Sequence, residues 1–260
     1  MPDSIDLNQP DNSLALITII TVVYNNVNHI KGAIQSVLLQ NYPNIEYVVI
    51  DGNSNDGTLE VLEEFRNQIS VLLVEPDTGI YDALNKGISL SNGEVVGFLH
   101  SDDFFANNDV IADIAKVFKN DKTEVVYGDL DYVKNNNESI VRRWKAGNFS
   151  QRKLNYGWMP PHPTFYARRE LYKNFGGFNL AYKIAADYDC MLRFLQKDIV
   201  VSYIPKVLIK MRVGGASNKS FRNIIQKSQE DYRVMKNNKI GGFVPLIWKN
   251  LSKLQQFFKQ

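Results

Sequence analysis

Residues 14–23 read LALITIITVV, a run of apolar and β-branched side chains without polar alternation. Such a run predicts a strand that is buried on both faces of a sheet. Asn25 or Asn28 can cap a following helix that runs to about Leu39. The alternation continues, with strands predicted over 46–50, 69–74, 94–99 and 125–133 and helices over 58–65, 81–90 and 109–118. This order predicts an α/β fold with a doubly wound, Rossmann-like, mostly parallel sheet.

The second half of the chain is less regular. Residues 158–163 contain three prolines and must form a loop, because proline cannot donate to a strand ladder. Further elements are predicted as a short helix over 187–195, strands over 200–203 and 207–213, and helices over 222–236 and 243–258. We therefore expect an α/β domain over residues 1–217 and a basic amphipathic helical segment over residues 218–260.

The composition is that of an ordinary globular protein, with 260 residues of which 44% are hydrophobic and 22% charged. Cys190 is the single cysteine, which excludes an internal disulfide and a cysteine zinc site and suits a reducing cytoplasm. Residues 1–12 are polar and acidic, unlike a secretory signal, and no apolar run is long enough to span a bilayer. A cytoplasmic protein is therefore expected.

The net charge of +2 hides an asymmetry. Residues 218–260 carry nine basic and two acidic side chains, a net charge of +7, which leaves −5 on the rest of the chain. A basic tail suits an anionic partner such as a phospholipid surface or nucleic acid, and a solvated helix face is the plainer alternative. The body of the chain contains no nucleic-acid motif, so no nucleic acid is expected as a partner.

Polar clusters follow three of the predicted strands, at residues 21–25, 51–58 and 101–103. Ligands of open α/β sheets bind at the carboxyl ends of strands, so these clusters are expected to meet at one site. Asp102 and Asp103 repel each other unless a cation or solvent neutralises them, and carboxylates suit Mg²⁺ or Mn²⁺. A surface turn that caps the next helix is the alternative. Neither G-x-G-x-x-G nor a P-loop motif is present.

Five motifs in order resemble family 2 of the inverting glycosyltransferases, which have the GT-A fold. They are TVVYN (21–25), DGNSNDGT (51–58), DTGIYDALNKG (77–87), SDD (101–103) and ADYD (186–189). The resemblance extends from about Leu14 to Val213. It implies transfer of a sugar from a nucleotide-diphosphate donor to an acceptor hydroxyl with inversion, in a divalent-metal-dependent reaction.

The resemblance also implies roles for donor-side residues. Thr21 and Tyr24 would line the base pocket, and Asp51 would accept the N3–H of a pyrimidine, which fits UDP and dTDP alike. Asp82, Asn85 and Lys86 would lie near the diphosphate and donor sugar. Asp102 would contact the ribose or the metal, and Asp103 would be the main metal ligand. The plainer alternatives are that Tyr24 belongs to the core, that Lys86 is solvated, and that Asp56 to Thr58 form a turn and helix cap.

On the acceptor side, Asp187 matches the general base of the family, although Ala186 stands where a glutamate is usual. Asp189 is the second candidate base, with a helix N-terminal carboxylate as its alternative. His162, Trp158 and Arg212 are candidate contacts to the acceptor or diphosphate. No histidine follows Arg212 to complete a metal site, which leaves the third protein ligand unidentified. The Q-x-x-R-W signature of processive synthases is also missing, so one sugar is expected per encounter.

The family resemblance points to cell-surface polysaccharide synthesis with a sugar or lipid-linked saccharide acceptor. Apolar residues at helical spacing in 243–258, interleaved with lysines, predict a helix that lies on the inner face of the membrane. Packing of that stripe on the catalytic domain and a homodimer contact are the alternatives.

Two other classes of protein compete. A dehalogenase-type phosphatase fails because Ser54 stands where its nucleophilic aspartate is needed. A non-catalytic carbohydrate- or nucleotide-binding protein on the same fold would be expected to lack Asp103 or Asp187.

Overall fold

The computed structural model describes residues 14–135, 138–213, 221–241, 245–246 and 249. Its first half has the predicted alternation of strands and helices. β1 (Ile17–Val23), β2 (Ile45–Asp51), β3 (Val71–Val74) and β4 (Val95–Phe98) are parallel neighbours in the order β3-β2-β1-β4. Every residue of β1 is buried, as the unbroken apolar run predicts.

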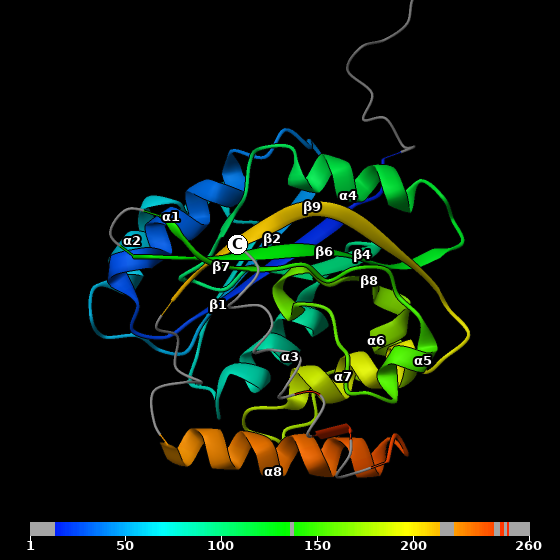
Figure 1. Cartoon of the computed structure of the whole chain (residues 1–260). Coiled ribbons are helices and arrows are strands. Elements are labelled where there is room, and N and C mark those ends of the chain that lie inside the picture. Colours follow the sequence, from blue (N-terminus) through cyan, green and yellow to red (C-terminus); the bar gives the residue numbers. More distant parts are fainter. Residues whose placement is uncertain (1–13, 136–137, 214–220, 242–244, 247–248, 250–260) are drawn as a thin grey trace, which may run out of the picture.

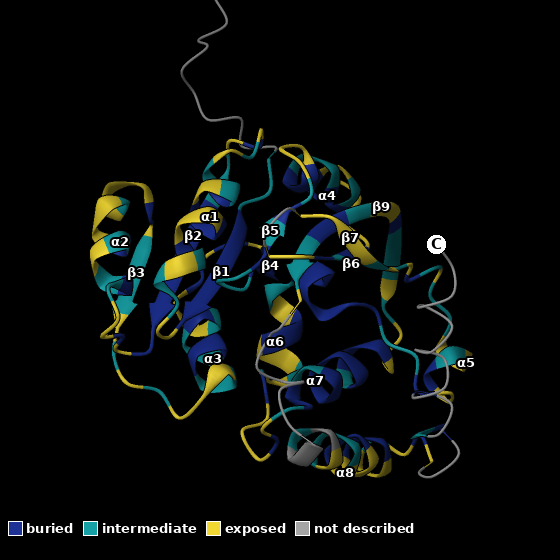
Figure 2. Ribbon diagram, turned by 60° about the vertical axis from the view of Figure 1, so that its left-hand side comes forward, coloured by how far each residue is buried: buried dark blue, intermediate teal, exposed yellow. Residues whose placement is uncertain are grey.

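Helices cover both faces of this sheet, because successive β1 side chains point to opposite sides. Ile17 and Ile19 pack with α1 (Val27–Leu38) and α4 (Val110–Phe118), whereas Ile20 and Val22 pack with α3 (Ile80–Leu90). The short helix α2 (Thr58–Glu64) and the 3-10 turn η1 (Arg66–Gln68) lie beside β3. The strands are buried, whereas the outer surface of α2 is exposed (Figure 2).

The second half of the sheet is mixed. β8 (Tyr166–Arg168) lies between β4 and β6 (Thr123–Val133) and is antiparallel to both, so β6 does not extend the parallel set directly. β9 (Val200–Arg212) pairs in parallel with β6, and β5 (Phe104–Phe105) and β7 (Ile140–Trp144) add antiparallel pairs. The predicted α/β fold with a mostly parallel sheet is confirmed, the sheet is curled, and the short strands β5, β7 and β8 were not predicted.

β9 corrects the prediction of two separate strands over 200–203 and 207–213. Its register on β6 steps from Ile204 opposite Gly128 to Val207 opposite Asp129, so Pro205 and Lys206 fall in an irregularity of the ladder. A proline without an N–H is tolerated at such a place. The proline therefore bulges the strand without ending it.

The remaining helices lie on the α3 face of the sheet (Figure 1). They are α5 (Gln151–Leu154), the 3-10 turn η2 (His162–Thr164), α6 (Arg169–Phe175), α7 (Ala186–Leu195) and α8 (Phe221–Asn237). α7 lies between the sheet and α8, and its ribbon is almost entirely buried (Figures 1 and 2). Val234 and Met235 of α8 are 0% exposed and belong to the same core as α7.

The segment predicted as a separate unit from residue 218 thus begins with a helix that is packed on the domain. The predicted boundary itself, and most of the predicted helix over 243–258, lie outside the described residues. Among the helices that the structure does describe, none is long and apolar enough to cross a membrane.

Candidate active site

Tyr24 and Asp51 meet at the carboxyl ends of β1 and β2, as the parallel order requires. The Tyr24 ring is 63% exposed, so the alternative that it belongs to the core is wrong. Gly52 lies beneath this ring, and a Cβ there would stand 3.3 Å from Tyr24 Cδ2 and 2.6 Å from Asp77 Oδ2. A larger residue would therefore force Tyr24 or Asp77 out of place. Asp77, which was not among the predicted site residues, belongs to this part of the site.

Thr21 and Asp51 have buried side chains. The Thr21 hydroxyl accepts a hydrogen bond from the Tyr47 hydroxyl at 3.2 Å, inside the core. The Asp51 carboxylate accepts from the Ser54 N–H and the Ser54 hydroxyl, both at 2.7 Å. Ser54, three residues further along the chain, thereby fixes the orientation of the Asp51 carboxylate. Each carboxylate oxygen can still accept another hydrogen bond. Thr21 is 0% exposed, so its place in the base pocket stays a prediction.

The loop after β2 is fastened to the start of α1. Asp56 accepts from the Val27 N–H at 3.1 Å and from the Thr58 N–H at 3.0 Å, so one side chain serves the first turns of two helices. Gly57 adopts φ +98°, a conformation that disfavours other residues. The turn-and-cap alternative for Asp56 to Thr58 is therefore confirmed.

The α3 residues that were predicted near the diphosphate are engaged with protein groups. Asp82 accepts from the Thr78 N–H at 2.9 Å, which lowers the pKa of Asp82. The Lys86 ammonium lies 2.7 Å from a Glu75 carboxylate oxygen and donates to the Pro76 carbonyl at 2.8 Å. The alternative of a merely solvated Lys86 is wrong, because this lysine fastens α3 to the end of β3.

Asn85 is hydrogen-bonded to the backbone of the loop before α7. Its amide donates to the Phe178 carbonyl and accepts from the Phe178 N–H, each at 2.8 Å. A Cβ on Gly177 would come within 2.4 Å of the Asn85 amide oxygen, so a larger residue would displace the Asn85 side chain. Asn85 is thus committed to the backbone of this loop, which departs from the predicted place beside the diphosphate.

Asp102 and Asp103 follow β4, and the structure distinguishes between them. Asp102 is half-buried, whereas Asp103 is 0% exposed. Asp103 Oδ1 accepts from the Arg212 N–H at 3.3 Å, and Oδ2 has no hydrogen-bond partner within the described part of the chain. Burial raises the pKa of Asp103 well above its ordinary value, and the charge of Asp102 raises it further.

Arg212 holds this turn rather than the predicted substrate. Its guanidinium donates to the Asp102 carbonyl at 2.7 Å and lies over the Phe104 ring, 4.5 Å from the centroid. The last residue of β9 thereby fixes the turn that carries both carboxylates.

The residues at this turn fit a divalent cation in kind, because carboxylate oxygens are the ligands that Mg²⁺ and Mn²⁺ prefer. The unpartnered, buried oxygen of Asp103 is the polar atom that a cation or a proton would satisfy. Across the described ranges no three His, Cys, Asp or Glu side chains form a metal-ligand cluster. Most ligands of a cation here would have to come from a bound diphosphate and water.

Asp187 lies in the first turn of α7 and lines a pocket of about 390 Å³. The Tyr81 hydroxyl lies 3.3 Å from Asp187 Oδ1 and 2.6 Å from the Ile184 carbonyl, which joins α3 to the start of α7. Met159, His100 and His162 line the same pocket. The carboxylate is therefore held at the wall of a cavity, as a general base requires.

The two histidines connect Asp187 with the Asp102 turn. Burial lowers the pKa of His100, against the opposing charges of Asp102 and Asp187. Burial likewise lowers the pKa of His162 to about 4, against the charge of Asp187. The rings lie 5.9 Å apart, and His162 packs between Phe98 and Phe178. His100 was not among the predicted site residues, although it directly precedes the SDD motif.

Trp158 and Asp189 have structural roles. The Trp158 ring packs edge-on against Tyr127, its N–H donates to the Ala146 carbonyl at 3.1 Å, and it is not one of the described residues that line the pocket. The predicted acceptor contact of Trp158 is therefore not supported. Asp189 forms an ion pair with Arg193 at 2.9 Å and lies away from the pocket, as its alternative predicted.

Basic side chains line the pocket opposite the sheet, and they were not among the predicted site residues. Lys183 comes from the loop before α7, Lys227 from α8, and Lys249 from beyond α8. The Lys249 ammonium is buried, lies 2.7 Å from Asp231 Oδ1 and stands 3.3 Å from the centroid of the Tyr188 ring. Part of the basic tail therefore belongs to the site wall.

The chain resembles known proteins along most of its length. Residues 18–200 match the family model described as glycosyl transferase family 2. A PGL/p-HBAD biosynthesis glycosyltransferase of Mycobacterium bovis is 29% identical over 209 residues, covering 78% of this chain and 79% of the relative. An uncharacterized glycosyltransferase of Rickettsia typhi is 30% identical over 227 residues, covering 85% and 70%.

Solved structures show the same fold. TarS 1–349 of S. aureus, crystallised with UDP-GlcNAc, superposes with a TM-score of 0.68 at 20% identity. That match covers 85% of this chain and 65% of TarS 1–349, so the chain spans just under two thirds of that length. The mannosyltransferase PcManGT of Pyrobaculum calidifontis, in complex with GDP-Man and Mn²⁺, gives a TM-score of 0.65 at 18% identity, covering 94% and 70%.

Proposed function

The chain belongs to glycosyltransferase family 2, and we propose that it transfers one sugar from a nucleotide-diphosphate donor to an acceptor hydroxyl with inversion. The observation that carries this proposal is the pocket that Asp187, His100 and His162 line, because His100 stands two residues before Asp102 and so brings this pocket to the turn that carries Asp102. A carboxylate in the pocket wall and another on the adjoining turn suit a reaction that takes a proton from the acceptor and stabilises a departing diphosphate.

Asp187 removes the proton of the acceptor hydroxyl as that oxygen attacks the anomeric carbon. The carbon–oxygen bond to the nucleotide diphosphate breaks in the same step, so an α-linked donor yields a β product. His100 and His162 stay neutral because burial lowers their pKa values, so neither imidazole places a positive charge beside Asp187. Met159 and Lys183, which line the same pocket, are proposed to contact the acceptor.

The donor base stacks on the exposed Tyr24 ring, and Asp51 accepts the N3–H of uracil or thymine. Both bases present this N–H, so UDP- and dTDP-sugars are the proposed donors. TarS was crystallised with UDP-GlcNAc, whereas PcManGT was crystallised with GDP-Man, so the fold itself accommodates different bases. Asp51 and Tyr24 are therefore the residues that select the donor.

Mg²⁺ or Mn²⁺ would supply positive charge to the leaving diphosphate when bound beside Asp102. We assign the leading ligand role to Asp102, since it is accessible, and a second, enclosed contact to Asp103, whose buried oxygen has no partner among the described residues. This ranking reverses the one that the sequence motif predicts, because burial places the Asp103 carboxylate inside the protein.

The test of donor and metal is thermal unfolding in the presence of UDP-, dTDP- and GDP-sugars, each with Mn²⁺ or with EDTA. A ligand at about 100 times its Kd adds about 2.7 kcal/mol to stability. We expect UDP- or dTDP-sugars to stabilise the protein in the presence of Mn²⁺ but not in the presence of EDTA. Equal stabilisation in EDTA would contradict the metal role, and preference for GDP-sugars would contradict the role of Asp51. A chain that binds donor but transfers no sugar would instead be a binding protein.

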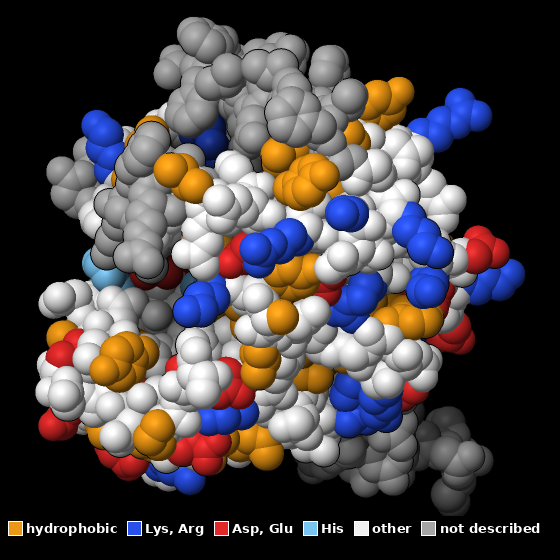
Figure 3. All heavy atoms as spheres, turned by 90° about the horizontal axis from the view of Figure 1, so that it is seen from below, with side chains coloured by type: hydrophobic (Ala, Val, Ile, Leu, Met, Phe, Trp, Pro, Cys, Tyr) orange, Lys and Arg blue, Asp and Glu red, His pale blue; other side chains and the backbone are white. Residues whose placement is uncertain are grey.

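We also propose that the enzyme acts at the inner face of the membrane on a lipid-linked acceptor, in cell-surface glycan synthesis. The face that carries α8 shows Lys and Arg side chains interspersed with hydrophobic ones (Figure 3). On α8, Ile225 and Tyr232 are exposed beside Arg233 and Lys236. Each basic residue near an anionic surface adds about 1 kcal/mol of attraction. Flotation with phosphatidylserine vesicles tests this attachment, with neutral vesicles as the control. We expect the protein to float with the phosphatidylserine vesicles, and failure to bind either kind of vesicle would contradict the proposal.

A further inference from the structure

Glu230 of α8 binds the backbone that leads into α7. One of its carboxylate oxygens, Oε2, accepts from the Ile184 N–H at 2.8 Å and from the Ala185 N–H at 3.0 Å. The other, Oε1, accepts from the Gln226 side chain at 2.9 Å. The side chain is 5% exposed, so it has exchanged water for these donors. Burial alone would raise the pKa of Glu230, but the hydrogen bonds outweigh burial and lower it, so the group is charged at neutral pH.

These two amides stand immediately before the proposed base. Ala185 is the residue that precedes the first turn of α7, and Asp187 follows two residues later. The Ile184 carbonyl is the group to which the Tyr81 hydroxyl donates at 2.6 Å. The peptide that carries Asp187 into the pocket is thus held from the α8 side by Glu230 and from the α3 side by Tyr81.

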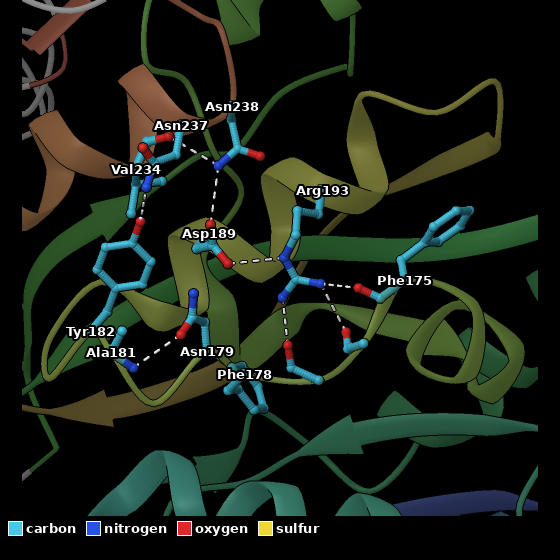
Figure 4. Close-up of polar contacts among 12 residues, drawn as sticks. Phe175, Phe178, Asn179, Ala181, Tyr182, Asp189, Arg193, Val234, Asn237 and Asn238 are labelled. Atoms are coloured by element: carbon cyan, nitrogen blue, oxygen red, sulfur yellow. Dashed lines mark hydrogen bonds and ion pairs between the residues drawn. The ribbon is translucent and has the colours of Figure 1, made fainter.

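The helix that carries Glu230 is itself firmly attached to α7. Figure 4 shows Asn238 donating to Asp189 of α7 at 3.1 Å, and Asn237 donating to the Tyr182 hydroxyl at 2.8 Å. Asp189 in turn pairs with Arg193, whose guanidinium binds carbonyls of the loop at 175–177 (Figure 4). A carboxylate on such a support can hold a backbone in one place.

We propose that Glu230 is a positioning residue for catalysis, which sets the direction of the Asp187 carboxylate by fixing the backbone at residues 184–185. This inference rests on the proposed role of Asp187. Glu230 is absent from the described residues that line the pocket, so it acts through the backbone and not by touching substrate. A misplacement of about 1 Å at a reacting group can lower a rate by about 100-fold, which makes such a hold consequential.

The test compares Glu230→Ala, Glu230→Gln and the control Gln229→Ala in the full chain. Gln229 is an exposed neighbour on the same helix. We expect Glu230→Ala to lower kcat by about 10- to 100-fold while KM for the donor and the Kd for UDP or dTDP stay unchanged. Glu230→Gln keeps an oxygen for the two N–H groups and should restore most of the rate. Equal rates in all three variants, or a loss of nucleotide affinity in Glu230→Ala, would overturn the inference.

A double-variant cycle separates positioning from general damage. In an Asp187→Asn background, Glu230→Ala should have little further effect on the residual rate, because the group that it positions is already inactive. If Glu230→Ala lowers the rate by the same factor in the Asp187→Asn background as in the wild type, Glu230 acts elsewhere and the proposal is overturned. If Asp187→Asn alone keeps its activity, the proposed base fails. If only the Glu230 variants keep theirs, the base stands and the positioning role fails.

Discussion

The β1–β4 half of the molecule and the α6–α8 half bring their functional side chains together by different means. Tyr24, Asp51 and Asp102 lie at one edge because parallel strands end there, and Ser54 fixes Asp51 from three residues away. Asp187 depends on contacts from distant segments, with Tyr81 on one side and Glu230 on the other. The donor side is thus set by sheet topology, whereas the base side is set by long-range side-chain contacts. Damage to one half should leave the other half's task intact.

The largest expected effect separates the two halves at the base. Asp187→Asn keeps the shape but cannot take the proton, so transfer should fall by about 10²–10⁴-fold. Nucleotide affinity should hold, because Tyr24 and Asp51 belong to the other half. Rate assays and calorimetry with UDP or dTDP measure the two quantities. Asp198→Asn, an exposed carboxylate just beyond the same helix, is the matched control, and activity close to wild type in Asp187→Asn would place the base elsewhere.

The next effect concerns stability on the base side. Asp231→Ala leaves the buried Lys249 ammonium without its carboxylate and should cost about 3–5 kcal/mol in the free energy of unfolding. Glu64→Ala removes the exposed partner of Lys31 on the donor side and should cost less than about 1 kcal/mol. Urea unfolding measures both. Replacing the buried pair together, as Asp231→Leu with Lys249→Met, should recover most of the loss, and equal costs for the two single variants would contradict the comparison.

A smaller effect tests the metal edge of the donor side. Asp102→Ala should weaken Mn²⁺-dependent nucleotide binding by about tenfold or more, which corresponds to about 1.4 kcal/mol. Asp103→Ala should mainly lower the melting temperature, because it empties an enclosed space behind the turn. Calorimetry with Mn²⁺ and with EDTA compares them. A greater loss of metal dependence in Asp103→Ala would restore the ranking that the motif predicts.

The smallest effect tests the framework of the donor half. Glu46 accepts from Thr18 at 2.5 Å and from the Asn92 N–H at 2.7 Å. Burial alone would raise the pKa of Glu46. The hydrogen bonds from Thr18, Asn92 and Gly93 outweigh burial and lower the pKa below the ordinary value of 4.5. A lowered folded-state pKa contributes stability above pH 4.5 that is lost as the pH falls through the folded value. Glu46→Gln should therefore cost about 1 kcal/mol at pH 7.

The difference in the free energy of unfolding between wild type and Glu46→Gln should shrink as the pH falls below 4.5. Wild-type Glu46 then becomes protonated and, like the glutamine, carries no charge. Urea unfolding of both proteins at pH 7 and near pH 3.5 measures it. A difference that grows on acidification would contradict the assignment, and transfer activity at pH 7 should be unaffected in folded protein.

Periodicity and turn residues alone predicted β1 to β4, the helices between them and the meeting of their polar ends, because a buried parallel strand and a capped helix are local patterns. The same signals missed β5, β7 and β8, which are two to five residues long and owe their pairing to neighbours distant in the chain. They also divided β9 at Pro205, since the bulge that accommodates it depends on the partner strand.

For the site, the sequence by itself determined which residue types stand at the strand ends and that Asp187 opens a helix. Only the tertiary structure decided that Asp103 is enclosed while Asp102 is accessible, that Asn85 binds a loop, and that Glu230 holds the peptide before the base. The physical reason is that accessibility and hydrogen-bond partners are properties of the whole packed chain. A motif names a carboxylate, whereas packing decides whether water, a proton, an amide or a cation meets it.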